Sequence, residues 1–179
     1  DIMASGDTAM CPRDSVVLSA WDVPGASPSI MYHWSPFMYL SDTIAQTVTT
    51  KAETNVNYTV VGTNSYGCTD TAHVKVTVYP AAVITMEDSV TIYPGESYQI
   101  SPSTNCTQFT WFPATGLSDA YISNPVASPE ISTKYIVHAS TEQGCKAVDS
   151  ISIYIADDGI GNVKIYSSVQ NNIVPMMVI

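Results

Sequence analysis

The side chains of this sequence that could carry redox, nucleophilic or metal chemistry are four cysteines and three histidines: Cys11, Cys68, Cys106, Cys145, His33, His73 and His138. The cysteines form no Cys-x-x-Cys pair, and no histidine lies at metal-ligand spacing from them. The histidines fall in strand-like segments and outside motifs such as His-Glu-x-x-His. We therefore expect no active site and no zinc site, and disulfides in an oxidising compartment are the favoured role of the cysteines.

Charge and hydrophobicity exclude two further classes of protein. The chain has 16 Asp and Glu against 6 Lys and Arg, a net charge of -10, so it cannot build the basic face that a nucleic acid requires. Hydrophobic residues make up 45% of the sequence, enough for folded cores, but no run of about 18 apolar residues predicts a membrane span. The sequence thus predicts a globular protein with neither kind of partner.

An internal repeat organises the chain. Trp34-Ser35-Pro36 and Trp111-Phe112-Pro113 lie 77 positions apart, and the same spacing separates Tyr58 from Tyr135 and Gly67-Cys68 from Gly144-Cys145. Three landmarks in one register indicate a tandem duplication. The predicted units are residues 1–79, with an N-terminal arm 1–10 that lacks a strand pattern, and 81–156, joined at Pro80-Ala81; residues 157–179 form a separate tail.

Short segments of alternating apolar and polar residues predict the fold class. They cover residues 15–19, 30–34, 43–48, 56–61 and 72–78 in the first unit, and 90–92, 98–100, 108–112, 134–139 and 148–155 in the second. Val and Ile dominate, whereas Leu occurs three times, which favours sheet over helix. We expect an all-β chain of two tandem β-sandwiches, with Trp34 and Trp111 in their cores.

Several motifs resemble the immunoglobulin-like and PKD-like repeats of secreted Bacteroidota surface proteins. They are Cys-x-x-Asp-Ser-Val-x-Leu from Cys11, the Trp-Ser-Pro motif, Tyr-Thr-Val-x-Gly-Thr-Asn-Ser-x-Gly-Cys-Thr from Tyr58, and Trp-Phe-Pro-Ala-Thr-Gly-Leu-Ser with Asn-Pro-Val-Ala-Ser-Pro in the second unit. The resemblance covers about 150 residues. It implies an exported protein at the cell surface, and such repeats serve as stalks, adhesin modules or spacers beside enzymes.

The repeat favours disulfides within each unit. Four cysteines allow three connectivities. We expect Cys11 to pair with Cys68 and Cys106 with Cys145, each bridge stabilising its unit by up to roughly 4 kcal/mol in the chain-entropy model. Sulfur bridges that cross between the halves would contradict this arrangement.

Two smaller groups of residues are candidates for binding. Trp21 begins an apparent insertion, residues 21–29, and is a candidate contact for a sugar or a protein. No cofactor is expected. Asp42, Asp119 and the pair Asp157-Asp158 offer the oxygen ligands that Ca²⁺ would need, although solvated turns are the favoured explanation of these residues.

The tripeptide Asp, then Ser or Thr, then an aliphatic residue occurs six times, where composition predicts roughly one. It resembles the O-glycosylation motif of exported Bacteroidota proteins, which implies glycans on Thr8, Ser15, Thr43, Thr71, Ser89 and Ser150. The alternative is structural, because Asp favours turns and a Ser or Thr followed by an aliphatic residue is a natural start for a strand.

The tail resembles the opening of a type IX secretion sorting domain, through Val163-Lys164-Ile165-Tyr166 and Asn171-Asn172-Ile173, but is shorter than a complete domain. Its apolar end offers six candidate subunit contacts: Ile173, Val174, Met176, Met177, Val178 and Ile179. A strand donated to a neighbouring sheet would build a homo-oligomer or filament, with residues 1–10 as the complementary segment. We therefore expect an extracellular structural protein, with a stalk or adhesin fragment that binds a surface glycan or protein as the alternative, and an accessory module of a secreted hydrolase third.

Overall fold

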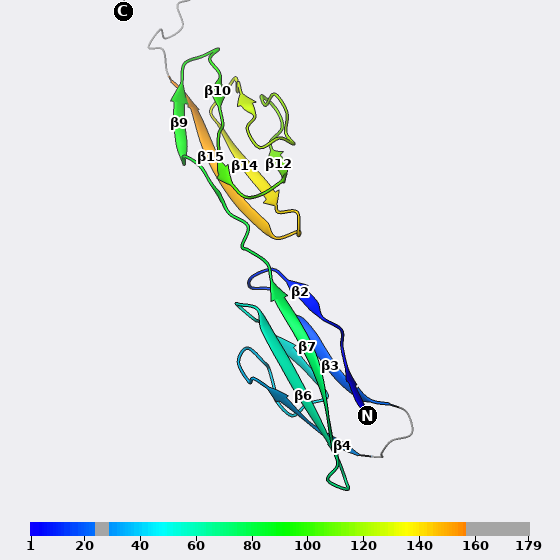
Figure 1. Cartoon of the computed structure of the whole chain (residues 1–179). Coiled ribbons are helices and arrows are strands. Elements are labelled where there is room, and N and C mark those ends of the chain that lie inside the picture. Colours follow the sequence, from blue (N-terminus) through cyan, green and yellow to red (C-terminus); the bar gives the residue numbers. More distant parts are fainter. Residues whose placement is uncertain (24–28, 157–179) are drawn as a thin grey trace, which may run out of the picture.

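The computed structural model describes residues 1–23 and 29–156 of the 179-residue chain. The regular secondary structure within these ranges consists of strands alone, as the sequence predicts. The strands gather into two sandwiches that lie end to end, connected by the segment around residue 80 (Figure 1). The duplication seen in the sequence therefore corresponds to two folded units in series.

The first unit contains seven strands in two sheets. Strands β1 (Ile2–Ala4), β3 (Val16–Asp22) and β5 (Thr47–Thr50) form one sheet, in the order β1-β3-β5. The other contains β2 (Thr8–Met10), β4 (Ile30–Ser35), β6 (Val56–Asn64) and β7 (Thr69–Val78), in the order β2-β7-β6-β4. These two sets correspond to the A-B-E and C-F-G sheets of an immunoglobulin-like sandwich.

The second unit repeats this plan. Its main sheet has the order β12-β14-β15-β9, made of β9 (Ser89–Ile92), β12 (Gln108–Phe112), β14 (Thr133–Ser140) and β15 (Lys146–Ile155). The facing layer consists of two short ladders. In one, β8 (Ile84–Thr85) pairs with β11 (Ser103–Thr104), and in the other β10 (Tyr98–Gln99) pairs with β13 (Val126–Ala127). The chain is thus all-β with two tandem immunoglobulin-like sandwiches, which confirms the expected fold class.

Residues 1–10 belong to the first sandwich. Strand β1 pairs antiparallel with β3, and β2 pairs in parallel with β7, with Met10 opposite Val78. The side chains of Ile2 and Met10 are 8% and 4% exposed and lie in the core. The expectation that this arm lacks strands is wrong, because each strand is only three residues long and too short to show a period of two.

The two predicted core tryptophans are buried, as expected. Trp34 and Trp111 are each 1% exposed. Each indole Nε1 donates a hydrogen bond of 2.9 Å to the backbone carbonyl eleven residues later, at Ala45 and Ile122. A buried indole N–H needs such an acceptor, because leaving it unpaired would cost its full desolvation.

The strand predicted over residues 43–48 runs instead over Thr47–Thr50. The residues before it are held against the first core tryptophan, because the carbonyls of Thr43 and Ala45 accept from the backbone N–H and the indole of Trp34. In the second unit Ala120 and Ile122 do the same for Trp111. Residues 43–46 are bends rather than a strand. Their mixed apolar and polar residues resemble those of a paired strand, which explains the error.

Candidate functional site

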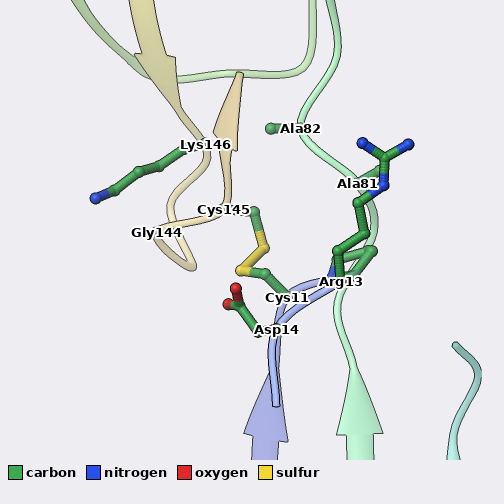
Figure 2. Close-up of a pocket in the computed structure, with 9 residues that line it drawn as sticks. Cys11, Arg13, Asp14, Ala81, Ala82, Gly144, Cys145 and Lys146 are labelled. Carbon is green, nitrogen blue, oxygen red and sulfur yellow. A yellow bond between two sulfur atoms is a disulfide. The ribbon is translucent and has the colours of Figure 1, made fainter. Parts of the chain in front are cut away.

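The most distinctive chemical feature is a disulfide between the two units. Cys11, which directly follows β2, is bonded to Cys145 in the turn between β14 and β15, 134 residues further along the chain. The bond spans the gap between the end of the first sandwich and the start of the second (Figure 2). The predicted pairs Cys11–Cys68 and Cys106–Cys145 are therefore both wrong.

Strand direction explains why Cys11 cannot bond Cys68. Because β2 runs parallel to β7, Cys11 lies beside the end of β7, whereas Cys68 immediately precedes its first residue. Ten residues of extended strand separate these two places, a length of roughly 30 Å, and a disulfide needs Cα atoms about 4.4 to 6.8 Å apart. Cys68 is an exposed free thiol, and Cys106 is a buried free thiol whose Sγ lies 3.8 Å from the carbonyl oxygen of Val83.

The turn that carries Cys11 has an unusual backbone. Asp14 donates its backbone N–H to the carbonyl of Cys11 at 3.2 Å, with Pro12 and Arg13 between them. Arg13 has a φ of 73°, the left-handed region in which a side chain is disfavoured. Proline followed by a residue of positive φ is the pattern of a type II turn. This turn reverses the chain at the end of β2 and presents the sulfur to the second unit.

The turn that carries Cys145 is fixed by its own hydrogen bonds. Thr141, which is buried, donates its backbone N–H to the carbonyl of Cys145 and accepts the backbone N–H of Cys145 on its hydroxyl. Gly144 has a φ of 84°, a conformation suited to glycine. Cys145 itself is 2% exposed. The hydrogen bonds of the hairpin therefore fix the backbone of Cys145, and with it the place from which its sulfur reaches the first unit.

The peptide segment beside the disulfide is bonded to both units. On the side of the first unit, Tyr79 donates its backbone N–H to the carbonyl of Met10 at 2.9 Å. On the side of the second, the Asn105 side chain accepts from the N–H of Val83 and donates to the carbonyl of Ala81. Only Pro80 thus separates the residues held by the two units, and the two connections, peptide and disulfide, run next to each other.

A cleft of about 500 Å³ lies between these connections. Its lining comes from both units and from the peptide between them: Cys11, Arg13, Asp14, Ala82, Cys145 and Lys146 (Figure 2). Two of the six cations of the chain are among these residues. The disulfide lines this cleft, and the lining contains neither a histidine nor a free cysteine. Thiol–disulfide exchange at this bond would therefore need a thiol from another molecule.

The other residues singled out from the sequence lie apart from this junction. Trp21 lies in β3, opposite Met3 of β1, rather than in an insertion, and is 39% exposed. The side chains of Asp42 and Asp119 accept hydrogen bonds from the backbone N–H groups of Ile44 and Tyr121. Across residues 1–23 and 29–156 there is no group of three His, Cys, Asp or Glu side chains that could hold a metal ion.

The six glycosylation candidates all lie in the described ranges. Ser15, Thr71 and Ser89 are exposed, whereas Thr8, Thr43 and Ser150 are half-buried. Some of the preceding aspartates have structural roles, since Asp70 and Asp149 accept the backbone N–H of the residue that follows them, and Asp7 accepts that of Lys75. The six subunit-contact candidates of the tail, and Asp157-Asp158, lie outside the described residues. In the part that is described, no helix is long and apolar enough to cross a membrane.

Sequence reasoning missed Arg13, Thr141 and Asn105 as determinants of the junction. One signal for the first was present. Cys11-Pro12-Arg13-Asp14 and Tyr93-Pro94-Gly95-Glu96 share a proline at the second position and an acidic residue at the fourth. In the structure both have the same turn hydrogen bond and a positive φ at the third residue. Aligning these two turns would have placed Cys11 at the end of a strand, and therefore at the end of the unit that faces its neighbour.

No family model and no curated protein matches the chain. Among solved structures, the I-band fragment I67-I69 of titin is similar with a TM-score of 0.46 and 15% identity, over 84% of this chain and 62% of that fragment. Extracellular domains 3–5 of Drosophila OTK give a TM-score of 0.48 and 10% identity, over 85% of this chain and 60% of that one. Three N-terminal domains of the bacteriophage RB49 outer capsid protein Hoc give a TM-score of 0.40 and 12% identity, over 82% of this chain and 56% of that one. The strand order of both units, rather than these similarities, defines the fold as immunoglobulin-like.

Proposed function

We propose that this chain is a stalk segment of an extracellular protein, which holds two immunoglobulin-like units in a fixed series and carries no catalytic activity. The observation that supports this most strongly is the double connection at the junction. The disulfide Cys11–Cys145 runs beside a peptide segment that is hydrogen-bonded to both units. Two neighbouring connections restrict bending and twisting, which a single linker would permit.

The disulfide also supports a location outside the reducing cytosol. Disulfides persist in secreted and cell-surface proteins, whereas cytosolic thiols are kept reduced. A load applied along the series would pass from one sandwich to the other through both the peptide at Pro80 and the bond at Cys11. Covalent reinforcement of this kind suits a spacer more than an enzyme.

Small-angle X-ray scattering tests the stalk function directly. The wild-type chain should scatter as one extended particle with a narrow distribution of inter-unit distances. The variant Cys11→Ser/Cys145→Ser should scatter as a flexible pair with a broader distribution. The matched control is Cys68→Ser, which removes a cysteine outside the bridge and should leave the curve unchanged. Equal flexibility of wild type and double variant would contradict the proposal.

Adhesion is the second candidate, because the first unit exposes several apolar side chains. Trp21 is 39% exposed, and near the turn after β4, Phe37 and Met38 are 78% and 53% exposed. Exposed aromatic residues are frequent contacts for sugars and proteins. A glycan array probed with wild type and Trp21→Ala tests this function, and equal signals would dismiss Trp21 as a contact.

Assembly into a filament is a finer version of the structural function. We propose it from the sequence of residues 173–179 alone, which are apolar. Their burial in a neighbouring sheet would be favourable by on the order of 10 kcal/mol. Because residues 1–10 already form β1 and β2, they are not the complementary segment. Light scattering of the chain with and without residues 173–179 tests this assembly, which the deletion should abolish; multimers that survive the deletion would remove it.

Glycans on the exposed candidates Ser15, Thr71 and Ser89 would add solubility to a surface poor in charge. Intact mass measurement of protein from its native source, followed by peptide mapping, tests this modification. Unmodified peptides at all six candidate positions would leave the tripeptide with the structural role alone.

A further inference from the structure

The free thiol of Cys68 occupies the same place in the first unit as the bonded Cys145 does in the second. In both, the cysteine carbonyl accepts a backbone N–H from the residue four positions earlier, Asn64 at 3.0 Å and Thr141 at 2.9 Å. In both, the side chain of that earlier residue accepts the cysteine N–H. The two glycines before the cysteines have φ values of 83° and 84°. The turn of the first unit is therefore preorganised in the form that makes a bridge between units.

The surroundings of the two cysteines also correspond. Beside Cys145 lie Ala81 and Ala82, where the chain enters the second unit. Beside Cys68, a hollow of about 240 Å³ is lined by the entry of the chain into the first unit, Asp1 and Ile2, together with Asp70. The carboxylate of Asp70 accepts the N–H of Ile2 at 2.8 Å. The β6–β7 hairpin that carries this hollow lies at the end of the first unit away from the second (Figure 1).

Because Cys145 is bonded to Cys11, the place of Cys11 in its unit indicates what kind of residue Cys68 could bond. Cys11 lies directly after a strand that runs parallel to the last strand of its sandwich, in a Cys-Pro-x-Asp turn. Tyr93 stands at this position in the second unit, before Pro94, and is 62% exposed. A second copy of this chain therefore presents a phenol rather than a thiol, and its Cys11 is already bonded.

We propose that Cys68 forms a disulfide with the cysteine at this strand end of a further immunoglobulin-like unit, which docks on the free end of the first unit as the first docks on the second. Two thiols are oxidised and lose two electrons and two protons. A low-molecular-weight disulfide such as oxidised glutathione accepts the two electrons and two protons. It first forms a mixed disulfide with one cysteine and releases one thiol; the other cysteine then attacks this mixed disulfide and releases the second thiol. The first unit would then have a disulfide junction at each of its two ends, through Cys68 at one end and Cys11 at the other.

Peptide mapping of the protein from its native source, with thiols blocked at collection, tests this inference. Cys68 is expected in a disulfide with a cysteine that is followed by proline and lies outside residues 1–179. A Cys68 that is alkylated as a free thiol overturns the proposal, and so does a bond to Cys106 or to Cys68 of a second copy.

An engineered version uses the chain as it is. Tyr93→Cys places a thiol at the strand end of the second unit, and in a glutathione redox buffer we expect head-to-tail multimers joined through positions 68 and 93. Glu130→Cys is the matched control, because Glu130 is also exposed and belongs to the same unit but lies outside this turn. Multimers should be several-fold more abundant with Tyr93→Cys than with the control, and adding Cys68→Ser should abolish them. Equal yields from the two variants, or multimers that survive Cys68→Ser, would overturn the proposal.

The disulfide of Cys68 extends the proposed stalk function and rests on it, but different results would refute the two proposals. A Cys68 that stays free removes the further unit and leaves the junction at Cys145 as it is. Flexibility of the junction, measured by scattering, would remove the stalk function without affecting the mapped partner of Cys68.

Discussion

Tyr58 and Tyr135 occupy equivalent positions in the two units, and each donates its hydroxyl to a backbone carbonyl twenty residues earlier, Met38 and Thr115, at 2.9 Å. Both side chains are fully buried. They differ in one respect. The hydroxyl of Tyr58 also lies 2.7 Å from Oγ1 of the buried Thr50, whereas the corresponding position in the second unit is Ala127.

Removing the two hydroxyls should therefore have unequal effects. Tyr135→Phe should lower the free energy of unfolding by about 1 kcal/mol, the net value of one hydrogen bond. Tyr58→Phe should lower it by about 2 to 3 kcal/mol, because the Thr50 hydroxyl loses its buried partner. Urea denaturation measures both, and adding Thr50→Ala to Tyr58→Phe should recover part of the loss. Equal losses from the two single variants would contradict this explanation.

The same two tyrosines predict how the fold responds to alkaline pH. Burial raises the pKa of Tyr58 and of Tyr135 above the ordinary value of 10.0. A raised pKa of this kind contributes stability that is fully present below the ordinary pKa and is lost as pH rises through the raised one. In a titration of tyrosinate absorbance, the last groups to ionise should do so together with the loss of near-ultraviolet circular dichroism. Complete ionisation with an unchanged near-ultraviolet signal would contradict the burial of these hydroxyls.

A glycine in strand β6 should resist substitution. A Cβ at Gly62 would lie 2.7 Å from Cγ2 of Ile2 and 3.2 Å from Cγ2 of Ile30. Gly62→Ala should therefore lower the free energy of unfolding by about 1 to 3 kcal/mol through overpacking. Gly6→Ala is the control, since nothing lies within 4 Å of its added Cβ. If both substitutions shift the urea midpoint equally, the close contact of β1 with β6 is not formed in solution.

The turn at Cys11 offers a stabilising substitution. Arg13 has a φ of 73°, and Gly95 has a φ of 83° in the matching turn of the second unit. Arg13→Gly should raise the free energy of unfolding by up to about 1 kcal/mol, and Gly95→Arg should lower it by a similar amount, because only glycine adopts this conformation without strain. Thermal denaturation of both variants checks the opposite signs. A loss of stability on Arg13→Gly would show that its side chain contributes more than its backbone costs.

Much of the fold was predictable because the pattern of each long strand is strong. The last strands of the two units bury Val74, Val76, Ile151 and Ile153 on one face, as the alternation predicts. The duplication was visible because the aromatic landmarks recur at one spacing. The short strands were not predicted, because two or three residues carry no periodic signal and are held by tertiary pairing. They are β1, β2, β8, β11 and β13.

The disulfide could not be predicted from the repeat alone. Symmetry favoured one bridge within each unit, but Cys11 and Cys68 lie at opposite ends of the parallel pair β2 and β7. The direction of β2 is set by its pairing with an edge of the far sheet, and a three-residue segment does not reveal that pairing. Once the direction is known, a bridge between units is the arrangement that remains open to Cys11.

Disulfide mapping of the purified chain tests the central claim most directly. Thiols are alkylated at collection, the chain is digested without reduction, and the linked peptides are identified by mass spectrometry. We predict one linked pair, Cys11 with Cys145, and an alkylated Cys106. A linked pair Cys11 with Cys68, a pair Cys106 with Cys145, or alkylation of both Cys11 and Cys145 would contradict the rigid junction and the stalk function built on it.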